Sequence, residues 1–233
     1  MSRLRPAKVR GALRRRWFER RMQRTPLDPV PGLVELGTAY GGWIVPDEEI
    51  APGWTCYCVG AGGDVSFDLE LIGRYGVTVR SFDAVEEYVG RAAAEADGTA
   101  GFSVHHAAIT TTDAPIRMQV THDQRSRSVS AAGLYDSREY VEVPGRTLPS
   151  LMAELGDSRV DLLKIDIEGS EYEVLPALDL AALGVKVLSV QLHHTGTVRE
   201  ARRLLARIRE QGYRPVACRP VVKLTWLRES ASR

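Results

Sequence analysis

The sequence predicts an α/β fold built on a mostly parallel sheet with an antiparallel hairpin at its C-terminal edge. Apolar strand-like runs alternate with helical segments from Thr55 onward, which is typical of βαβ units with helices on both faces of a sheet. Two short apolar runs, Tyr213–Cys218 and Val222–Leu227, are close enough to pair as a hairpin. With 233 residues, 44% of them apolar, the chain can form one sizeable core.

The predicted elements follow one another regularly along the chain. Strands are expected over residues 55–59, 77–82, 102–109, 160–167 and 186–192, and helices over 66–74, 84–96, 148–155, 170–178 and 198–211. The last helix is the clearest, because its apolar residues from Ala201 to Ile208 fall on one face, and Gly212 ends it. Residues 121–140 show neither period and are expected to leave the sheet.

The chain divides into two parts by composition. We predict that residues 1–53 form a basic arm and a connector rich in proline and glycine, and that residues 54–233 form the folded domain, whose core begins near Trp54. No apolar run approaches about 18 residues, so neither a membrane span nor a secretory signal is expected, and the expected location is cytoplasmic. The three cysteines, Cys56, Cys58 and Cys218, have neither disulfide nor zinc spacing, and all are expected to be reduced, buried packing residues.

The basic arm has two interpretations. Residues 1–24 hold ten lysines and arginines against one acid, Glu19, and such separated charge is an electrostatic feature in its own right. In the first interpretation, apolar residues such as Leu13, Trp17 and Met22 line one side of a helix that lies on an anionic membrane. In the second, Trp17 and Phe18 pack on the core or on the second subunit of a homodimer. Nucleic-acid binding is not expected, because no recognition motif accompanies the arm.

A glycine-rich turn follows the first predicted strand. In CYCVGAGGDVSFDLEL the strand leads into Gly60, Ala61 and Gly62, and a helix is expected to begin near Ser66. Glycines let bare backbone approach a ligand beside a helix N-terminus. Asp83 ends the second predicted strand, where an acid can accept hydrogen bonds from both ribose hydroxyls. The turn and Asp83 together indicate a nucleotide-type cofactor.

The residues after the glycines distinguish between two classes of cofactor. Dinucleotide enzymes need a third small residue at the sixth position of this motif, where a pyrophosphate meets the helix. This chain has Val65 at that position, preceded by Asp64, and an acid there would repel a pyrophosphate. The turn therefore favours a cofactor without phosphates, such as S-adenosyl-L-methionine, over a nicotinamide dinucleotide.

Ionisable residues gather at the ends of two later strands. In VDLLKIDIEGSEYEVLPAL, Asp166 and Glu168 come where the fourth strand should end, and open α/β sheets bind ligands outside the carboxyl ends of their strands. His193 and His194 end the fifth strand, and histidine suits proton removal at neutral pH. We expect these four residues to face one cleft.

Simpler interpretations stay open for this region. Lys164 and Asp166 share a strand face, and the alternative to a catalytic role is an internal ion pair between them. Glu171 and Glu173 are expected only to favour the N-terminus of the following helix. The alternative for the two histidines is a structural role.

Together and in this order, these segments resemble the FkbM family of S-adenosylmethionine-dependent methyltransferases. LLKIDIEGSEYEVL, residues 162–175, is close to the hallmark of the family, and VGAGGDVSFDLEL, VRSFDAVEEYV, VEVPGRTLPSLMAEL and GYRPV are similar to its other motifs. The resemblance runs from about Thr55 to Leu227. It implies a Rossmann-like class I methyltransferase fold with a seven-stranded, mostly parallel sheet, and S-adenosyl-L-methionine as the cofactor.

The resemblance also implies a reaction and a set of contacts. Members typically methylate hydroxyls, so we expect O-methylation of a sugar, glycolipid or secondary metabolite. Some other methyltransferases hold Mg²⁺ at the same strand ends, where Asp166 and Glu168 could contribute ligands, but no metal is expected here. The expected catalytic residues are Asp166, Glu168, His193 and His194. The expected cofactor contacts lie in the glycine turn and at the ends of the second and third strands: Gly60, Ala61, Gly62, Asp64, Ser66, Asp83, Ala84 and Ala107.

Departures from the family pattern leave two questions open. Many members have an acid in place of Cys58 and Asn in place of Gly62, and the family often has a Glu and a His one residue apart where this chain has adjacent histidines. The proton acceptor is therefore open among His193, His194 and Asp166. The alternative function is a cofactor-binding regulatory or assembly protein without turnover.

Acceptor choice is expected to lie within residues 121–140. Arg125, Arg127 and Arg138 would contact an anionic group of the acceptor there. A plain surface loop is the alternative.

Overall fold

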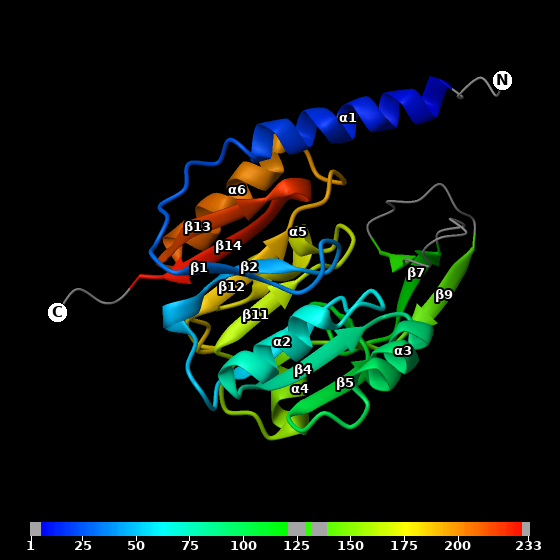
Figure 1. Cartoon of the computed structure of the whole chain (residues 1–233). Coiled ribbons are helices and arrows are strands. Elements are labelled where there is room, and N and C mark those ends of the chain that lie inside the picture. The colour runs from blue at the N-terminus through cyan, green and yellow to red at the C-terminus, as the bar shows by residue number, and fades with distance from the viewer. Residues whose placement is uncertain (1–5, 121–128, 132–138, 230–233) are drawn as a thin grey trace.

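The computed structural model describes residues 6–120, 129–131 and 139–229. At its centre is one seven-stranded sheet in the order β13-β14-β12-β11-β3-β4-β5 (Figure 1). Strand β14 is antiparallel to both of its neighbours, and the other adjacent pairs are parallel. The strands are β3 (Thr55–Val59), β4 (Thr78–Asp83), β5 (Phe102–His106), β11 (Leu162–Ile165), β12 (Val187–Gln191), β13 (Tyr213–Arg219) and β14 (Lys223–Arg228).

This arrangement confirms the predicted α/β class, the seven-stranded sheet and the antiparallel C-terminal hairpin. It adds one detail, because β14 lies between β12 and the edge strand β13. The predicted strand over residues 160–167 is shorter in the structure. After Ile165 the chain leaves the sheet and turns through Glu168 and Gly169, both with positive φ.

Two apolar clusters cover the two faces of the sheet, because successive strand residues point to opposite faces. Tyr57 and Val59 pack in one cluster with α4 (Leu148–Leu155), α5 (Glu171–Val174) and α6 (Val198–Glu210). Cys56 and Cys58 are free, buried and packed in the other cluster with α2 (Ser66–Tyr75). Helix α3 (Glu86–Ala96) contacts β4 and β5. The packing role expected of these two cysteines is confirmed.

Of two predicted helices, the structure confirms one and shortens the other. Helix α6 is confirmed with its apolar face buried, and Thr197 and Glu200 form a capping box at its start. The helix expected over residues 170–178 is only four residues long as an α-helix, and a short 3₁₀ turn over Leu175–Ala177 follows it. Pro176 lies in that turn and has no N–H to donate, so the α-helical hydrogen bonds cannot continue through it.

The prediction that the core begins near Trp54 is wrong. An antiparallel hairpin of β1 (Leu33–Leu36) and β2 (Trp43–Pro46) precedes the main sheet. Trp43 and Val45 are fully buried in the cluster that contains α2. The division of the chain at residues 53 and 54 stays a prediction, but apolar residues on both sides of it share one core.

The basic arm forms helix α1 (Pro6–Met22), which lies along the outside of the molecule next to α6 (Figure 1). Phe18 and Met22 are one turn apart and buried against the cluster that contains α6. Trp17 is 53% exposed. Packing on the protein's own core therefore applies to Phe18 and Met22 but not to Trp17.

Outside the main sheet, residues after β5 form two small sheets. Strand β6 (Ala108–Ile109) pairs in parallel with β10 (Gly145–Arg146). A three-stranded antiparallel sheet joins β7 (Ile116–Val120), β8 (Val129–Ser130) and β9 (Tyr140–Val143). Arg125, Arg127 and Arg138, the residues expected to contact an anionic acceptor group, lie outside the described residues.

Candidate functional site

A cavity of about 660 Å³ opens at the carboxyl ends of β3, β4, β11 and β12. It brings together nearly all of the predicted site residues: Gly60, Ala61, Gly62, Asp64, Asp83, Ala84, Ala107, Asp166, Glu168, His193 and His194. Among the predicted residues, Ser66 does not line the cavity. The two acids at the ends of the second and fourth predicted strands, Asp83 and Asp166, therefore share one space.

Gly60, just after β3, lies close to the backbone of Asp166, just after β11. Its φ is +82°, and a Cβ placed on it would overlap the backbone oxygen of Asp166. Its N–H donates to the carbonyl of Phe82 at 2.8 Å. The turn therefore needs bare backbone at this position, for conformation and for space.

Asp83 ties the glycine turn to the end of β4. One carboxylate oxygen accepts the N–H of Gly62 at 2.8 Å, and the other accepts the N–H of Val85 at 2.7 Å. Burial raises the pKa of Asp83, while these amides act in the opposite direction. The carboxylate is thus fixed in place at the cavity wall, and each oxygen keeps a further lone pair for a ligand.

Asp64 and Ser66 stabilise the far side of the turn. The Ser66 hydroxyl donates to Asp64 Oδ1 at 2.5 Å, and the Thr38 hydroxyl donates to Asp64 Oδ2 at 2.6 Å. Burial acts to raise the pKa of Asp64, but these hydrogen bonds hold it below its ordinary value. Ser66 therefore orients Asp64 and does not itself face the cavity.

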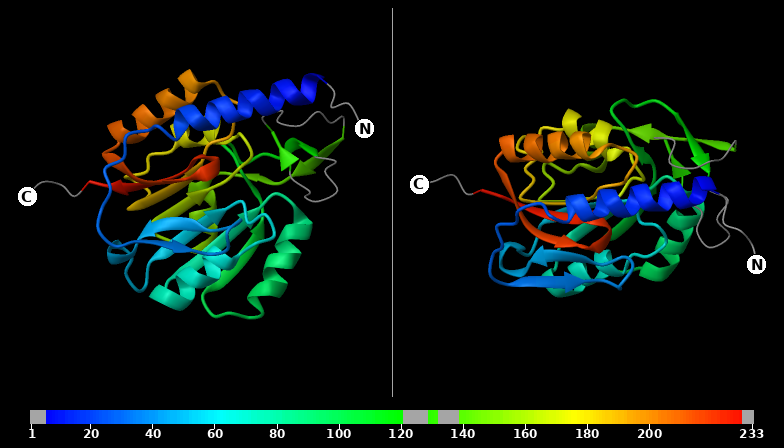
Figure 2. Two further views of the ribbon diagram at one scale, coloured as in Figure 1. Left: turned by 45° about the horizontal axis from the view of Figure 1, so that its top comes forward. Right: turned by 90° about the horizontal axis from the view of Figure 1, so that it is seen from above.

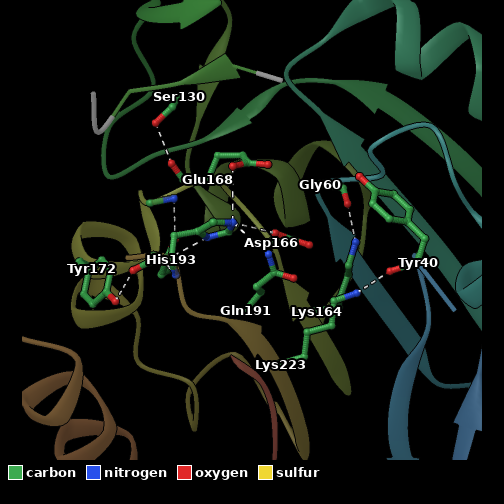
Figure 3. Close-up of polar contacts among 12 residues, drawn as sticks. Tyr40, Gly60, Ser130, Lys164, Asp166, Glu168, Tyr172, Gln191, His193 and Lys223 are labelled. Carbon is green, nitrogen blue, oxygen red and sulfur yellow. Dashed lines mark hydrogen bonds and ion pairs between the residues drawn. The ribbon is translucent and has the colours of Figure 1, made fainter. Parts of the chain in front are cut away.

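His193 is the centre of a charged cluster on the other side of the cavity (Figure 3). Its Nε2 lies 3.6 Å from Asp166 Oδ1 and 3.5 Å from Glu168 Oε2. The side-chain amide of Gln191 lies 3.0 Å from the same nitrogen. The hydroxyl of Tyr172 donates to the His193 carbonyl at 2.7 Å. Residues from the ends of β11 and β12 thus converge on one imidazole.

Glu171 has a larger role than the sequence indicated. Its side chain is fully buried and accepts the His193 backbone N–H at 2.6 Å and the Gly169 N–H at 2.9 Å. Its Oε1 also lies 3.3 Å from His193 Nδ1. Glu173, the other acid of this helix, is exposed. The expectation that both acids only favour the helix N-terminus is wrong for Glu171.

The pKa values of the two adjacent histidines, His193 and His194, are shifted in opposite directions. Burial lowers the pKa of His193, but the hydrogen bond and charge of Glu171, with the charges of Asp166 and Glu168, raise it to about 9. Burial and the charges of two arginines, Arg14 and Arg15, lower the pKa of His194. At neutral pH His193 is a cation and His194 is neutral.

Two lysines line the cavity beside the indole of Trp43. Lys164 Nζ donates to the Gly60 carbonyl and forms no ion pair with Asp166. Lys223 Nζ donates to the Tyr40 carbonyl at 2.9 Å (Figure 3). The Trp43 ring centroid lies 5.9 Å from Lys164 Nζ and 4.7 Å from Lys223 Nζ.

Lys223 was missed as a site residue by the sequence reasoning. Burial lowers its pKa to about 8. It begins β14, opposite Gln191 of β12, and this pairing follows only from the insertion of β14 beside β12. The only local indication in the sequence that Lys223 belongs to the site is that it is a lysine within an apolar strand.

Glu168 has a strained backbone at the cavity wall. Its φ is +50°, which is uncommon for a residue with a side chain. The Ser130 hydroxyl donates to the Glu168 carbonyl at 2.7 Å, so the small sheet that contains β8 contacts this turn. Such strain is concentrated at functional sites, where the surrounding structure maintains it.

The described ranges lack two features. No group of three or more His, Cys, Asp or Glu residues there is arranged to hold a metal ion. In the same part of the chain, no helix is both long enough and apolar enough to cross a membrane.

The strand order with its single antiparallel strand, and the cavity at the glycine turn, define a Rossmann-like class I methyltransferase fold. The model of the methyltransferase FkbM domain matches residues 59–215. The chain therefore belongs to the FkbM family of S-adenosylmethionine-dependent methyltransferases. No curated protein sequence matches it.

Several solved structures are similar to this chain at low identity. Methyltransferase FkbM from Methylobacillus flagellatus KT is 14% identical with a TM-score of 0.45, and the match covers 76% of this chain and 43% of that one. Precorrin-6y C5,15-methyltransferase from Geobacter metallireducens GS-15 is 12% identical with a TM-score of 0.46, covering 79% and 85%. A SAM-dependent methyltransferase from Geobacter sulfurreducens, in complex with S-adenosyl-L-homocysteine, is 13% identical with a TM-score of 0.41, covering 73% and 61%. This chain thus spans less than half the length of the first of these proteins.

Proposed function

We propose that the protein transfers a methyl group to a hydroxyl of a sugar, glycolipid or secondary metabolite. One observation carries the proposal: a single cavity joins the glycine turn and Asp83 to the charged cluster around His193. The glycine turn and Asp83 suit the binding of a nucleoside. The charged cluster offers groups that can accept or donate a proton. An O-methyltransferase needs both within reach of one substrate.

The residues of the cavity fit S-adenosyl-L-methionine. A side chain at Gly60 would fill the cradle, and Asp83 keeps lone pairs for ribose hydroxyls. The ammonium groups of Lys164 and Lys223 suit the carboxylate of the cofactor. When bound, the cofactor supplies an electrophilic methyl group on a sulfonium.

The charged cluster favours a cation even though His193 is protonated. Three carboxylates, those of Asp166, Glu168 and Glu171, surround the one imidazolium. The cluster is therefore net negative and attracts a sulfonium in a cavity that screens charge less than bulk water does. Asp166 and Glu168 line the cavity, and we assign them to orient the acceptor hydroxyl beside that charge.

The proton of the hydroxyl requires an acceptor that is free at neutral pH. His193 already carries a proton below about pH 9. Asp166 and the neutral His194 both line the cavity and remain as the two candidates. We therefore assign His193 to positioning the carboxylates, and the proton acceptor to one of the other two.

A thermal-shift comparison tests the cofactor assignment. We expect S-adenosyl-L-homocysteine to raise the melting temperature and NAD to leave it unchanged, because a ligand that binds only the folded state stabilises it. Asp83→Ala should weaken binding of S-adenosyl-L-homocysteine by about 1–3 kcal/mol. A rise with NAD alone would contradict the assignment. Isotope-labelled S-adenosyl-L-methionine with pooled sugar, lipid and metabolite acceptors then tests for O-methylated product.

The second candidate is a cofactor-binding regulatory or assembly protein without turnover. The adjacent histidines in place of the usual pattern, together with the protonated state of His193, favour it. It requires stabilisation by S-adenosyl-L-homocysteine and no methylated product in any acceptor pool. Product formation by the wild-type protein that is lost in Asp166→Asn would rule it out.

A further inference from the structure

Helices α1 and α6 form one strongly basic face outside the candidate active site. The two helices contact each other and lie side by side in both views of Figure 2. Between them is a second cavity of about 270 Å³, lined by four arginines and four other residues: Arg21, Met22, Arg24, Thr25, Pro26, Arg202, Leu205 and Arg209. We call the exposed surface of the two helices the α1–α6 face.

The arginines of this face are exposed and not neutralised. Those with exposed side chains and no ion pair in the described residues are Arg14, Arg16, Arg20, Arg21, Arg24, Arg199, Arg202, Arg203, Arg207 and Arg209. The acids on the same two helices are Glu19, which pairs with Arg15, and Glu200 and Glu210. Glu200 is engaged in the capping box at the start of α6. The face therefore carries a large net positive charge.

Two apolar side chains project from the middle of this charge. Leu13 is 60% exposed and Trp17 is 53% exposed. They are one helical turn apart, and a helical wheel places them on the side of α1 opposite the buried Phe18 and Met22. The guanidinium of Arg21 lies 5.6 Å from the Trp17 ring centroid. Exposed Trp and Leu side chains among arginines can enter a headgroup layer while the arginines contact lipid phosphates.

Helix α1 also contributes to the candidate active site through the side opposite Leu13 and Trp17. Arg15, Phe18 and Glu19 of α1 line that cavity together with His194. A guanidinium nitrogen of Arg14 donates to the His194 carbonyl at 3.1 Å. Helix α1 thus lies between the cavity, which one of its sides lines, and the outer side that carries Leu13 and Trp17.

We propose that the α1–α6 face docks on a membrane that contains anionic phospholipids. Leu13 and Trp17 enter the headgroup layer, and the arginines, including those around the second cavity, bind lipid phosphates. The docking itself does not depend on the methyl-transfer reaction.

The charge and shape of the face favour lipid over two other partners. A second copy of this chain would bring two faces of the same charge together, with only Leu13 and Trp17 to offset the repulsion. A nucleic acid would satisfy the arginines but would leave the aliphatic side chain of Leu13 without a role. A lipid headgroup layer accommodates both the charge and the apolar pair.

Trp17 is a fluorescent probe of docking that the protein already contains. Of its four tryptophans, Trp43, Trp54 and Trp226 are buried and Trp17 is exposed. We expect vesicles of phosphatidylcholine and phosphatidylglycerol to shift the emission to shorter wavelength and to co-sediment the protein. Vesicles of phosphatidylcholine alone should do neither, and high salt should reverse both effects. Trp17→Phe should keep the co-sedimentation and lose the emission shift.

Charge reversal on the face supplies the matched comparison. Arg202→Glu should weaken binding to the anionic vesicles roughly 10- to 30-fold, because two units of charge change at the contact. Arg228→Glu makes the same change at an exposed position at the end of β14 and should leave binding unaltered. Equal weakening by both variants would overturn the docking surface.

Three other outcomes would also overturn the proposal. They are absence of binding to either vesicle, equal binding to both, and displacement from anionic vesicles by an equal charge concentration of RNA. A protein that dimerises without vesicles and buries Trp17 in doing so would assign the face to a second copy.

The thermal shift with S-adenosyl-L-homocysteine is measured in parallel and does not involve the outer side of α1. Failure of docking and failure of the proposed function are therefore distinguishable.

Discussion

The two sides of the candidate active site are built by different means. On the β3–β4 side, backbone groups dominate: the turn at Gly60 has no room for a side chain, and Asp83 is held by two backbone amides. On the β11–β12 side, side chains dominate, and Glu171, Asp166 and Glu168 surround His193. The first side has a fixed shape, and its two carboxylates, Asp64 and Asp83, are held by hydrogen bonds. The second concentrates three carboxylates around one imidazole.

This difference separates binding from chemistry within one cavity. A wall made of backbone suits a ligand that is the same in every turnover, because its geometry does not depend on rotamers or on pH. A wall made of coupled side chains suits a step in which charge and a proton move. We therefore expect substitutions on the first side to change binding and stability, and substitutions on the second to change turnover and pH dependence.

The largest expected effect is that of Asp166→Asn on turnover. Asn keeps the shape of the side chain but removes a carboxylate charge from the cluster and a candidate proton acceptor from the cavity. Turnover should fall by about 10²–10⁴-fold, while the affinity for S-adenosyl-L-homocysteine should change by no more than about tenfold. Initial rates and calorimetric titration measure the two quantities.

Asp97→Asn is the control for this substitution. Asp97 is exposed at the C-terminal end of α3 with a φ of +39°, a conformation that Asn also adopts readily. It should have wild-type turnover. Equal turnover in the Asp166 variant and the wild type would remove Asp166 from the chemistry and erase the contrast between the two sides.

The next effect is that of Gly60→Ala on stability and binding. The added Cβ meets the Asp166 backbone, and alanine is strained at a φ of +82°. Together these should cost roughly 2–5 kcal/mol of unfolding free energy and abolish the thermal shift with S-adenosyl-L-homocysteine. Urea unfolding measures the first quantity.

Gly62→Ala separates the steric cost of an added Cβ from the cost of a positive φ. Gly62 also has a positive φ, of +59°, but a Cβ there meets no atom within 4 Å. Its cost should be limited to the conformational part, about 1–2 kcal/mol, and its N–H can still donate to Asp83. If both variants lose the same stability, the close approach to Asp166 is not the reason for glycine at position 60.

The same contrast explains what could be predicted from the sequence. Alternation of apolar runs and glycine positions is local, so the parallel sheet, the turn at Gly60 and the acid at Asp83 were accessible from the order of residues. The helix α6 was accessible for the same reason. The backbone side of the cavity was thus predicted nearly in full, because local sequence specifies backbone geometry.

The side-chain half depends on contacts between distant segments. The sequence predicts that Asp166, Glu168, His193 and His194 share one cleft. It does not predict the raised pKa of His193, because the hydrogen bond and charge of Glu171 cause much of that rise. The position of Glu171 in the first turn of a helix indicated only a surface acid, and its contact with His193 requires β11 and β12 to be adjacent. Lys223 reaches the cavity only because β14 inserts beside β12.

Glu171→Gln should have a smaller effect, on stability and on the pKa of His193. The folded-state pKa of His193 is raised to about 9 from an ordinary value near 6.5. The resulting stabilisation is fully present below about pH 6.5 and is lost as the pH rises through about 9. The variant should therefore lose roughly 1–3 kcal/mol of unfolding free energy at pH 6, and the difference should shrink toward pH 9.

Glu173→Gln is the matched control for that substitution. It makes the same chemical change two residues away, at an exposed acid of the same helix. Its unfolding free energy should stay within about 0.5 kcal/mol of the wild type at both pH values. A loss that does not depend on pH in the Glu171 variant would contradict the assignment of His193 as a cation held by Glu171.

The smallest expected effect, and the sharpest test of the charged side, is the change of turnover between pH 7 and pH 8. If His194 accepts the proton, it is already free at pH 7, because burial and the charges of Arg14 and Arg15 hold its pKa below the ordinary value near 6.5. Turnover at saturating cofactor should then change by less than about twofold over this interval. If His193 were the acceptor, its pKa of about 9 would make turnover rise by nearly tenfold over the same interval. His194→Asn then separates the two remaining candidates, because a flat profile with retained turnover assigns the proton to Asp166, whereas loss of turnover assigns it to His194.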